Sequence, residues 1–188
     1  MLTVIIPAFN EAQSLPLLLP EVFAYCAGQQ WKIIVVNDGS TDGSKEILSH
    51  YEKNDSFRVI HHKLNKGYGA ALKSGLLACD TKYAVTIDAD GQHYLEDIDN
   101  LLANMVSHDA DVVVGSRKGA VSDSSYRGLG KGIIRTLAKM LMTVPIHDLN
   151  SGMKIYDTAL AKKKSEDMLP ASQYASMSGI KAPIVAGL

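Results

Sequence analysis

The feature that most constrains the fold is a repeated alternation of short apolar runs with segments of helical periodicity. Apolar runs rich in β-branched residues occupy positions 2–6, 31–36, 57–61, 83–87 and 111–114, and helical patterns lie between them. Such alternation predicts an α/β protein with a Rossmann-like, mostly parallel sheet and helices on both faces. In sheets of this kind the ligand crevice lies beyond the carboxyl ends of the strands. We therefore expect the functional residues directly after these runs.

Length and composition indicate one compact domain. The chain has 188 residues, of which 46% are hydrophobic, so it can bury a sizeable core. We expect the domain over residues 1–160 and an irregular tail over residues 161–188, where periodicity weakens and Ser, Ala and Pro become frequent. A formal net charge of -1 provides no global field for nucleic acid, so we expect no nucleic-acid partner.

The sequence indicates a cytoplasmic location. Cys26 and Cys79 form neither a C-x-x-C motif nor a disulfide framework, which is typical of reduced thiols in the cytosol. No basic leader precedes the first apolar run, and no apolar stretch reaches the roughly 18 residues of a membrane span. We expect any membrane contact to be peripheral, at the cytoplasmic membrane face.

An acidic cluster, D-A-D-G-Q-H at residues 88–93, follows the fourth apolar run. Two carboxylates two residues apart, with an amide oxygen two residues further on, can converge on one hard divalent cation and leave positions open for phosphate oxygens. The alternative is a solvated acidic turn, because Asp and Gly are common loop residues. His93 could also ligate a metal, but hard cations held by oxygen ligands rarely recruit imidazole, so we favour a structural role for it.

A basic segment and a glycine pair allow other interpretations. Residues 126–143 have a helical pattern in which basic residues recur every four positions and so share one face. This face is either solvated or directed at anionic groups, and its apolar neighbours belong either to the core or to an interface with anionic lipid. Gly67 and Gly69 could begin a dinucleotide-binding fingerprint, but the third glycine is missing and residues 63–66 do not form a buried strand, so we disfavour that reading.

Six short motifs follow one another along the chain. They are V-I-I-P-A-F-N-E at 4–11, V-V-N-D-G-S-T-D at 35–42, N-K-G-Y-G-A-A at 65–71, D-A-D-G-Q-H at 88–93, G-S-R at 115–117 and D-L-N-S-G at 148–152. In this order they resemble the family 2 glycosyltransferases of the GT-A fold, and within them the dolichyl-phosphate mannose synthase and polyprenyl-phosphate glycosyltransferase branch. Each motif is weak alone, but six in this order are specific, and the resemblance covers roughly residues 2–156.

The resemblance implies a binding site for a nucleoside diphosphate sugar, linked to GDP or UDP. It implies Mg2+ or Mn2+ held by Asp90 and Gln92, with Asp88 contributing directly or through water. Asp90 and Arg117 are the implied catalytic residues, and Arg117 would meet phosphate charge. The donor-binding residues that the resemblance implies are Pro7, Phe9, Glu11, Val36, Asp38, Asp88, Ala89 and Asp90.

The implied reaction is a metal-dependent, inverting transfer of one hexose to a polyprenyl (dolichyl-type) phosphate. A phosphate oxygen is already an anion at neutral pH, so this acceptor needs cations rather than a general base. The basic residues that we expect to contact the acceptor phosphate are Arg117, Arg127, Lys131 and Arg135.

Two alternatives remain open. The same donor site could serve a hydroxyl acceptor on a glycan or protein, with Asp148 as base, or the chain could bind a nucleotide sugar without turnover. The Q-x-x-R-W sequence of processive polysaccharide synthases of this fold is missing, so we disfavour polymer synthesis.

Overall fold

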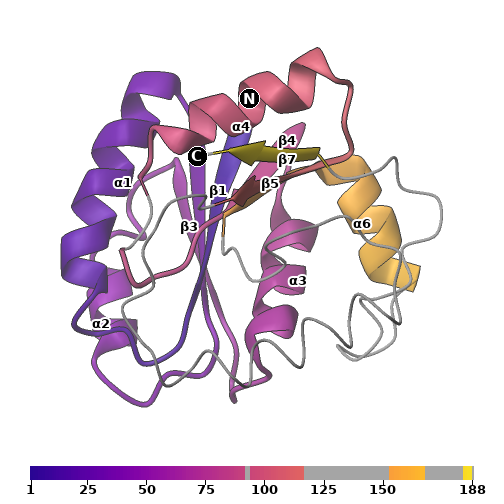
Figure 1. The fold of residues 1–188 in the computed structure, drawn as a ribbon. Helices are drawn as coiled ribbons and strands as arrows, with labels where there is room; N and C mark the ends of the chain where they lie inside the picture. The colour runs from indigo at the N-terminus through magenta and orange to yellow at the C-terminus, as the bar shows by residue number, and fades with distance from the viewer. Residues whose placement is uncertain (92–93, 117–152, 168–183, 188) are drawn as a thin grey trace, which may run out of the picture.

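The computed structural model describes residues 1–91, 94–116, 153–167 and 184–187, and the strands of this part of the chain form one sheet (Figure 1). The strand order is β3-β2-β1-β4-β6-β5-β7. The strands are β1 (Leu2–Ala8), β2 (Lys32–Asn37), β3 (Phe57–His61), β4 (Tyr83–Thr86), β5 (Val112–Ser116), β6 (Lys154–Asp157) and β7 (Ile184–Gly187). The helices are α1 (Leu15–Gln29), α2 (Ser44–Ser49), α3 (Tyr68–Ala78), α4 (Asp97–Ser107) and α6 (Thr158–Asp167).

The expected α/β architecture is confirmed. Strands β3, β2, β1 and β4 are parallel neighbours, as the alternation of strand and helix patterns predicted. Strand β6 is antiparallel to both of its neighbours, β4 and β5, and joins the two halves of the sheet. Lys154, near the start of β6, pairs with Thr86 of β4 and with Val114 of β5. The carboxyl ends of β4 and β5 therefore lie at the same edge of the sheet.

Two parts of the expected irregular tail are regular instead. Helix α6 continues to Asp167, so a boundary at residue 160 falls inside a helix, and β7 pairs with β5 in parallel. The start of α6 has a local cause, because Asp157 Oδ1 accepts a hydrogen bond from the Leu160 N–H at 3.1 Å, as capping side chains do. Strand β7 covers an edge of β5 whose backbone groups would otherwise lack strand partners. The prediction of an irregular segment was wrong for residues 161–167 and 184–187.

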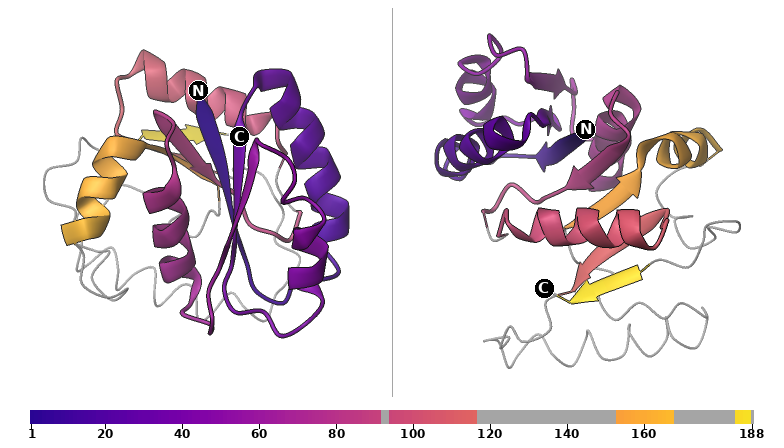
Figure 2. Two further views of the ribbon diagram at one scale, coloured as in Figure 1. Left: turned by 180° about the vertical axis from the view of Figure 1, so that it is seen from behind. Right: turned by 90° about the horizontal axis from the view of Figure 1, so that it is seen from above.

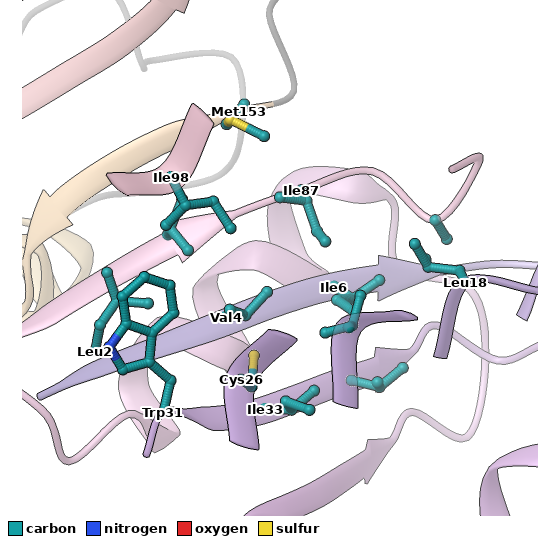
Figure 3. Close-up of a cluster of buried hydrophobic side chains, with 14 of the residues drawn as sticks. Leu2, Val4, Ile6, Leu18, Cys26, Trp31, Ile33, Ile87, Ile98 and Met153 are labelled. Carbon is teal, nitrogen blue, oxygen red and sulfur yellow. The ribbon is translucent and has the colours of Figure 1, made fainter. Parts of the chain in front are cut away.

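The core lies on both faces of β1, which is buried along its whole length. On one face, Val4 and Ile6 pack with Leu18 and Cys26 of α1 and with Ile98 of α4 (Figure 3). The opposite face is covered by α3, in agreement with the arrangement of helices in Figure 2. Alternate side chains of a strand point to opposite faces, so a central strand covered on both sides is apolar at successive positions.

Both cysteines are free thiols, and both are buried. Among the helices of the described ranges, none combines the length and the apolarity that a bilayer span requires.

Candidate functional site

The loops that follow β1 and β2 are tied together at the carboxyl edge of the sheet. The N–H of Asn10 donates to Ser40 Oγ at 3.0 Å, and the N–H of Glu11 donates to Ser44 Oγ at 2.9 Å. In the reverse direction, the N–H of Thr41 donates to Asn10 Oδ1 at 2.9 Å. These bonds supply hydrogen-bond partners to backbone groups of both loops and hold the loops together. We call the two loops, residues 9–14 and 38–43, the loop wall.

Asp38, directly after β2, joins this wall to the loop between β3 and α3. The residue is 3% exposed, and its carboxylate accepts hydrogen bonds from the N–H groups of Lys66 at 3.0 Å and Gly67 at 2.7 Å. His62 Nδ1 lies 2.5 Å from Asp38 Oδ1, and His62 Nε2 lies 2.8 Å from Ser74 Oγ on α3. An ionised carboxylate only accepts hydrogen bonds, so His62 Nδ1 is the donor in the first contact.

These donors keep Asp38 ionised in spite of its burial. Burial raises the pKa of Asp38, but the hydrogen bonds from His62 and from the N–H groups of Lys66 and Gly67 together outweigh it, and the pKa lies below its usual value. The carboxylate of Asp38 thus fixes the loop before α3. The donor-binding role expected for Asp38 stays a prediction, and the structure adds this positioning role.

Gly39 allows the same two loops to approach closely. Its φ is +71°, and a Cβ at this position would lie 2.4 Å from the carbonyl carbon of Leu64 and 2.5 Å from the nitrogen of Asn65. Both the left-handed backbone and the contact with backbone atoms exclude a side chain. The loops after β1, β2 and β3 therefore form a single assembly at the carboxyl edge.

The acidic cluster follows β4 at this edge. Asp88 is partly buried, Ala89 is buried and Asp90 is exposed. The hydroxyl of Tyr68, the first residue of α3, donates to Asp88 Oδ1 at 2.9 Å. Partial burial and the carboxylates of Asp88 and Asp90 raise the pKa of Tyr68 above its usual value, so the phenol keeps its proton at neutral pH.

No sequence pattern pointed to a role for Tyr68, nor for His62, which contacts Asp38. Tyr68 lies within the N-K-G-Y-G-A-A motif, but its partner Asp88 is 20 residues away. The only local signal was an aromatic residue at the start of an expected helix.

The other predicted donor-site residues occupy two kinds of position. Pro7 and Val36 are buried neighbours in β1 and β2 and lie within the sheet behind the wall. Phe9 is 44% exposed, and the Glu11 carboxylate accepts a hydrogen bond from Ser14 Oγ at 2.7 Å. The predicted site residues that lie outside the described part of the chain are Gln92, His93, Arg117, Arg127, Lys131, Arg135 and Asp148.

The carboxylates of Asp88 and Asp90 fit a divalent cation whose other ligands are diphosphate oxygens and water. Among the residues of the described ranges, no three His, Cys, Asp or Glu side chains gather into a closed metal site. Mg2+ is commonly bound through one or two carboxylates, with the remaining ligands from phosphates and water. Asp88 and Asp90 supply hard oxygen ligands of this kind, and Asp90 is open to solvent.

A shallow depression of about 300 Å³ lies elsewhere, lined by residues 79–82 and by residues of α6 with Asp157. Residues 79–82 precede β4, whereas Asp88 follows it, so the depression lies at the opposite edge of the sheet. Its lining contains neither carboxylate of the acidic cluster.

Comparison with known proteins identifies the family of this chain. The model of the family described as glycosyl transferase family 2 matches residues 3–165. The chain belongs to glycosyl transferase family 2. This family 2 chain is 35% identical over 169 residues to the polyprenol monophosphomannose synthase of Mycolicibacterium smegmatis, covering 85% of the chain and 63% of that relative. It is 30% identical to the undecaprenyl-phosphate 4-deoxy-4-formamido-L-arabinose transferase of Pseudomonas savastanoi pv. phaseolicola, covering 89% of the chain and 52% of that relative.

Solved structures confirm the fold of the family 2 chain. It aligns with the mannosyltransferase of Pyrobaculum calidifontis, determined in complex with GDP-Man and Mn2+, with a TM-score of 0.70 and 18% identity over 99% of the chain and 54% of that structure. The fold is therefore that of the GT-A transferases. The chain spans between about half and two thirds of the length of these relatives.

Proposed function

We propose that this family 2 chain transfers one hexose from a nucleoside diphosphate sugar to a polyprenyl phosphate, with inversion and with the help of Mg2+ or Mn2+. The observation that carries the proposal is the position of Asp88 and Asp90, which follow β4 at the edge where the loops after β1, β2 and β3 meet. Two relatives are named a polyprenol monophosphomannose synthase and an undecaprenyl-phosphate transferase, and these names support a polyprenyl phosphate as acceptor.

The wall after β1 and β2 would receive the nucleoside. Phe9 presents an exposed ring that can pack against a base, since aromatic faces bind flat apolar surfaces. The donor-side residues proposed are Pro7, Phe9, Glu11, Val36 and Asp38, with Asp88 and Ala89 along the ribose and first phosphate. The hydrogen bonds between the loops hold this wall in place before a donor arrives, which lowers the entropy cost of binding.

Asp90, with Gln92 and Asp88, would hold the divalent cation. When bound, the cation supplies positive charge that stabilises the departing diphosphate. An oxygen of the acceptor phosphate forms a bond to the anomeric carbon as the bond from that carbon to the diphosphate breaks, which inverts the configuration. The acceptor is already an anion, so the chain needs no general base for this step.

Cationic side chains would position the acceptor phosphate. Arg117 directly follows β5, whose carboxyl end lies at the same edge as that of β4. Arg127, Lys131 and Arg135 share one face of an expected helix and would extend the positive charge. The same basic face favours peripheral contact with an anionic cytoplasmic membrane surface, where a polyprenyl phosphate resides.

The reaction is tested by incubating the protein with Mn2+ and a panel of labelled nucleoside diphosphate sugars, with and without a short polyprenyl phosphate. We expect release of nucleoside diphosphate and labelled lipid only when the lipid phosphate is present. Transfer to a hydroxyl acceptor, or donor binding without turnover under every condition, contradicts the proposal. Arg117→Ala is expected to reduce turnover, and full activity would remove Arg117 from the phosphate site.

The metal role is tested by Asp90→Ala. We expect this variant to lose Mn2+-dependent donor binding, because an exposed carboxylate ligand is removed from a site with few protein ligands. Titration calorimetry of a nucleoside diphosphate with and without Mn2+ measures this. The matched control is Asp55→Ala, an exposed aspartate in the turn before β3, which should bind like the unmodified chain. An unchanged dissociation constant in Asp90→Ala would refute the metal role.

A further inference from the structure

The contact between Tyr68 and Asp88 joins two elements that are separate in the sequence. The Tyr68 hydroxyl, at the start of α3, donates to Asp88 Oδ1, beyond the end of β4, at 2.9 Å. Tyr68 is 51% exposed, although it is a large aromatic residue, so its position is not explained by burial in the core. The structure assigns to Tyr68 the role of a positioning residue, which holds the Asp88 carboxylate in the orientation that the divalent cation and diphosphate require. This inference rests on the proposed function.

Helix α3 presents Tyr68 from a fixed place. The residue before it, Gly67, has a φ of +89°, and its N–H donates to the buried carboxylate of Asp38 at 2.7 Å. The carbonyl of Gly67 accepts from the N–H groups of Ala70 at 3.0 Å and Ala71 at 3.1 Å, which closes the first turn. Both the N–H and the carbonyl of Gly67 are therefore hydrogen-bonded, which fixes the start of α3.

The helix body is anchored as well. Gly75 lies against β1 so closely that a Cβ would be 2.4 Å from Ile5 Cγ2. Ser74 lies 2.8 Å from His62 Nε2, and His62 in turn contacts Asp38. The helix is therefore held to β1, β2 and β3, and the Tyr68 hydroxyl reaches Asp88 from a rigid element.

A phenol suits this positioning role chemically. It donates one hydrogen bond to the carboxylate without neutralising it, whereas a cationic donor would compete with the metal for the negative charge. Restricting the Asp88 side chain to one orientation removes rotamer freedom that the cation would otherwise have to order on binding. Groups that orient metal ligands in this way change metal affinity by about 10- to 100-fold when they are removed.

The test is the affinity of Mn2+ in the presence of a nucleoside diphosphate, measured by electron paramagnetic resonance without turnover. Tyr68→Phe keeps the ring and removes only the hydroxyl, and we expect it to weaken Mn2+ binding by about tenfold. The midpoint of thermal unfolding and the affinity for the metal-free nucleoside diphosphate should not change. The control, Tyr25→Phe, removes a matched hydroxyl, which donates to Asp99 Oδ2 at 2.6 Å, and should leave Mn2+ affinity unaltered.

A double-mutant cycle distinguishes positioning from direct contact. In an Asp88→Asn background, Tyr68→Phe should have little further effect, because the hydroxyl acts through that carboxylate. Equal Mn2+ affinity in Tyr68→Phe and the unmodified chain overturns the inference, and so do additive effects or an equal loss of metal-free nucleotide binding. A Tyr68-dependent Mn2+ site without sugar transfer refutes the proposed function alone. If the unmodified chain shows no Mn2+ binding with nucleoside diphosphate, both fail.

Discussion

Asp38 shows how one buried charge can join the loop after β2 to the loop after β3. The side chain is nearly inaccessible to water, yet two backbone N–H groups and His62 donate to it. A carboxylate that loses water must gain such donors, because an uncompensated buried charge is strongly destabilising. The hydrogen bonds therefore make Asp38 as important for the geometry of the β3–α3 loop as for any contact with a donor.

We predict that Asp38→Asn changes both the stability of the fold and its dependence on pH. The pKa of Asp38 is lower in the folded chain than its ordinary value of about 4 in an unfolded chain. The stabilisation that ionised Asp38 gives the folded chain is fully present above the pKa of the unfolded chain. It is lost as the pH falls through the lower pKa of the folded chain. Asp38→Asn should reduce the free energy of unfolding at pH 7 by about 1–3 kcal/mol. It should also lessen the loss of stability below about pH 4.

Denaturant unfolding of both proteins between neutral and acidic pH measures these effects. The control is Asp55→Asn at an exposed turn, which should follow the unmodified chain. A variant that loses stability in acid as steeply as the unmodified chain would show that Asp38 makes no such contribution.

Helix α3 connects core packing to the candidate site, because its body packs on β1 and its first residue contacts the acidic cluster. Gly75 brings the helix close to Ile5, and Tyr68 at its start reaches the acidic cluster. A shift of the helix away from β1 would therefore move the Tyr68 hydroxyl as well. Dense packing transmits such a displacement, since neighbouring side chains have little room to yield.

We predict that alanine affects the free energy of unfolding differently at two glycines that lie in helices. Gly75→Ala places a Cβ against a buried side chain of β1 and should lower the free energy of unfolding by about 1–3 kcal/mol. Gly28→Ala in α1 meets nothing within 4 Å and should be neutral or stabilising by up to about 1 kcal/mol. Urea titrations of the two variants measure this difference. Equal stabilities would contradict the close approach of α3.

For the whole molecule, β6 makes the sheet continuous. Residues 117–153 separate β5 from β6 in the chain, yet β6 lies between β4 and β5 and runs antiparallel to both. Ile155 is the partner of Val85 on one side and of Val113 on the other, and it is fully buried. The strand thereby connects the half of the sheet that carries the loop wall with the half that ends before Arg117.

The prediction at this scale is that Ile155→Ala destabilises the entire domain. Removing a fully buried isoleucine should lower the free energy of unfolding by about 2–5 kcal/mol through lost burial and a residual cavity. Leu17→Ala, at a position that is 74% exposed, should change it by no more than about 0.5 kcal/mol. Thermal and denaturant unfolding, followed by circular dichroism, provides the comparison. A mild effect of Ile155→Ala would show that β6 is dispensable for the sheet.

Local patterns were sufficient to predict the four parallel strands β1 to β4. The runs at residues 2–6, 31–36, 57–61 and 83–87 each correspond to an observed strand. Strands β1, β2 and β4 are apolar at consecutive positions because both of their faces are buried, whereas the edge strand β3 is buried at Phe57 and exposed at Arg58 and His61. The helix in residues 161–167 and the strand at 184–187 were missed for the converse reason. Alanines and lysines gave the first no apolar face, and the second is a short run whose partner, β5, is about 70 residues away in the chain.

By itself the sequence determined the fold class, the family and the placement of an acidic cluster after β4, because each depends on residues that are neighbours in the chain. Only the tertiary structure decided which side chains act together. Asp38 meets His62, and Tyr68 meets Asp88, across 24 and 20 residues respectively. Hydrogen bonds require atoms to lie within about 3 Å of each other, and for residues this far apart in the chain that distance is set by how strands and helices pack.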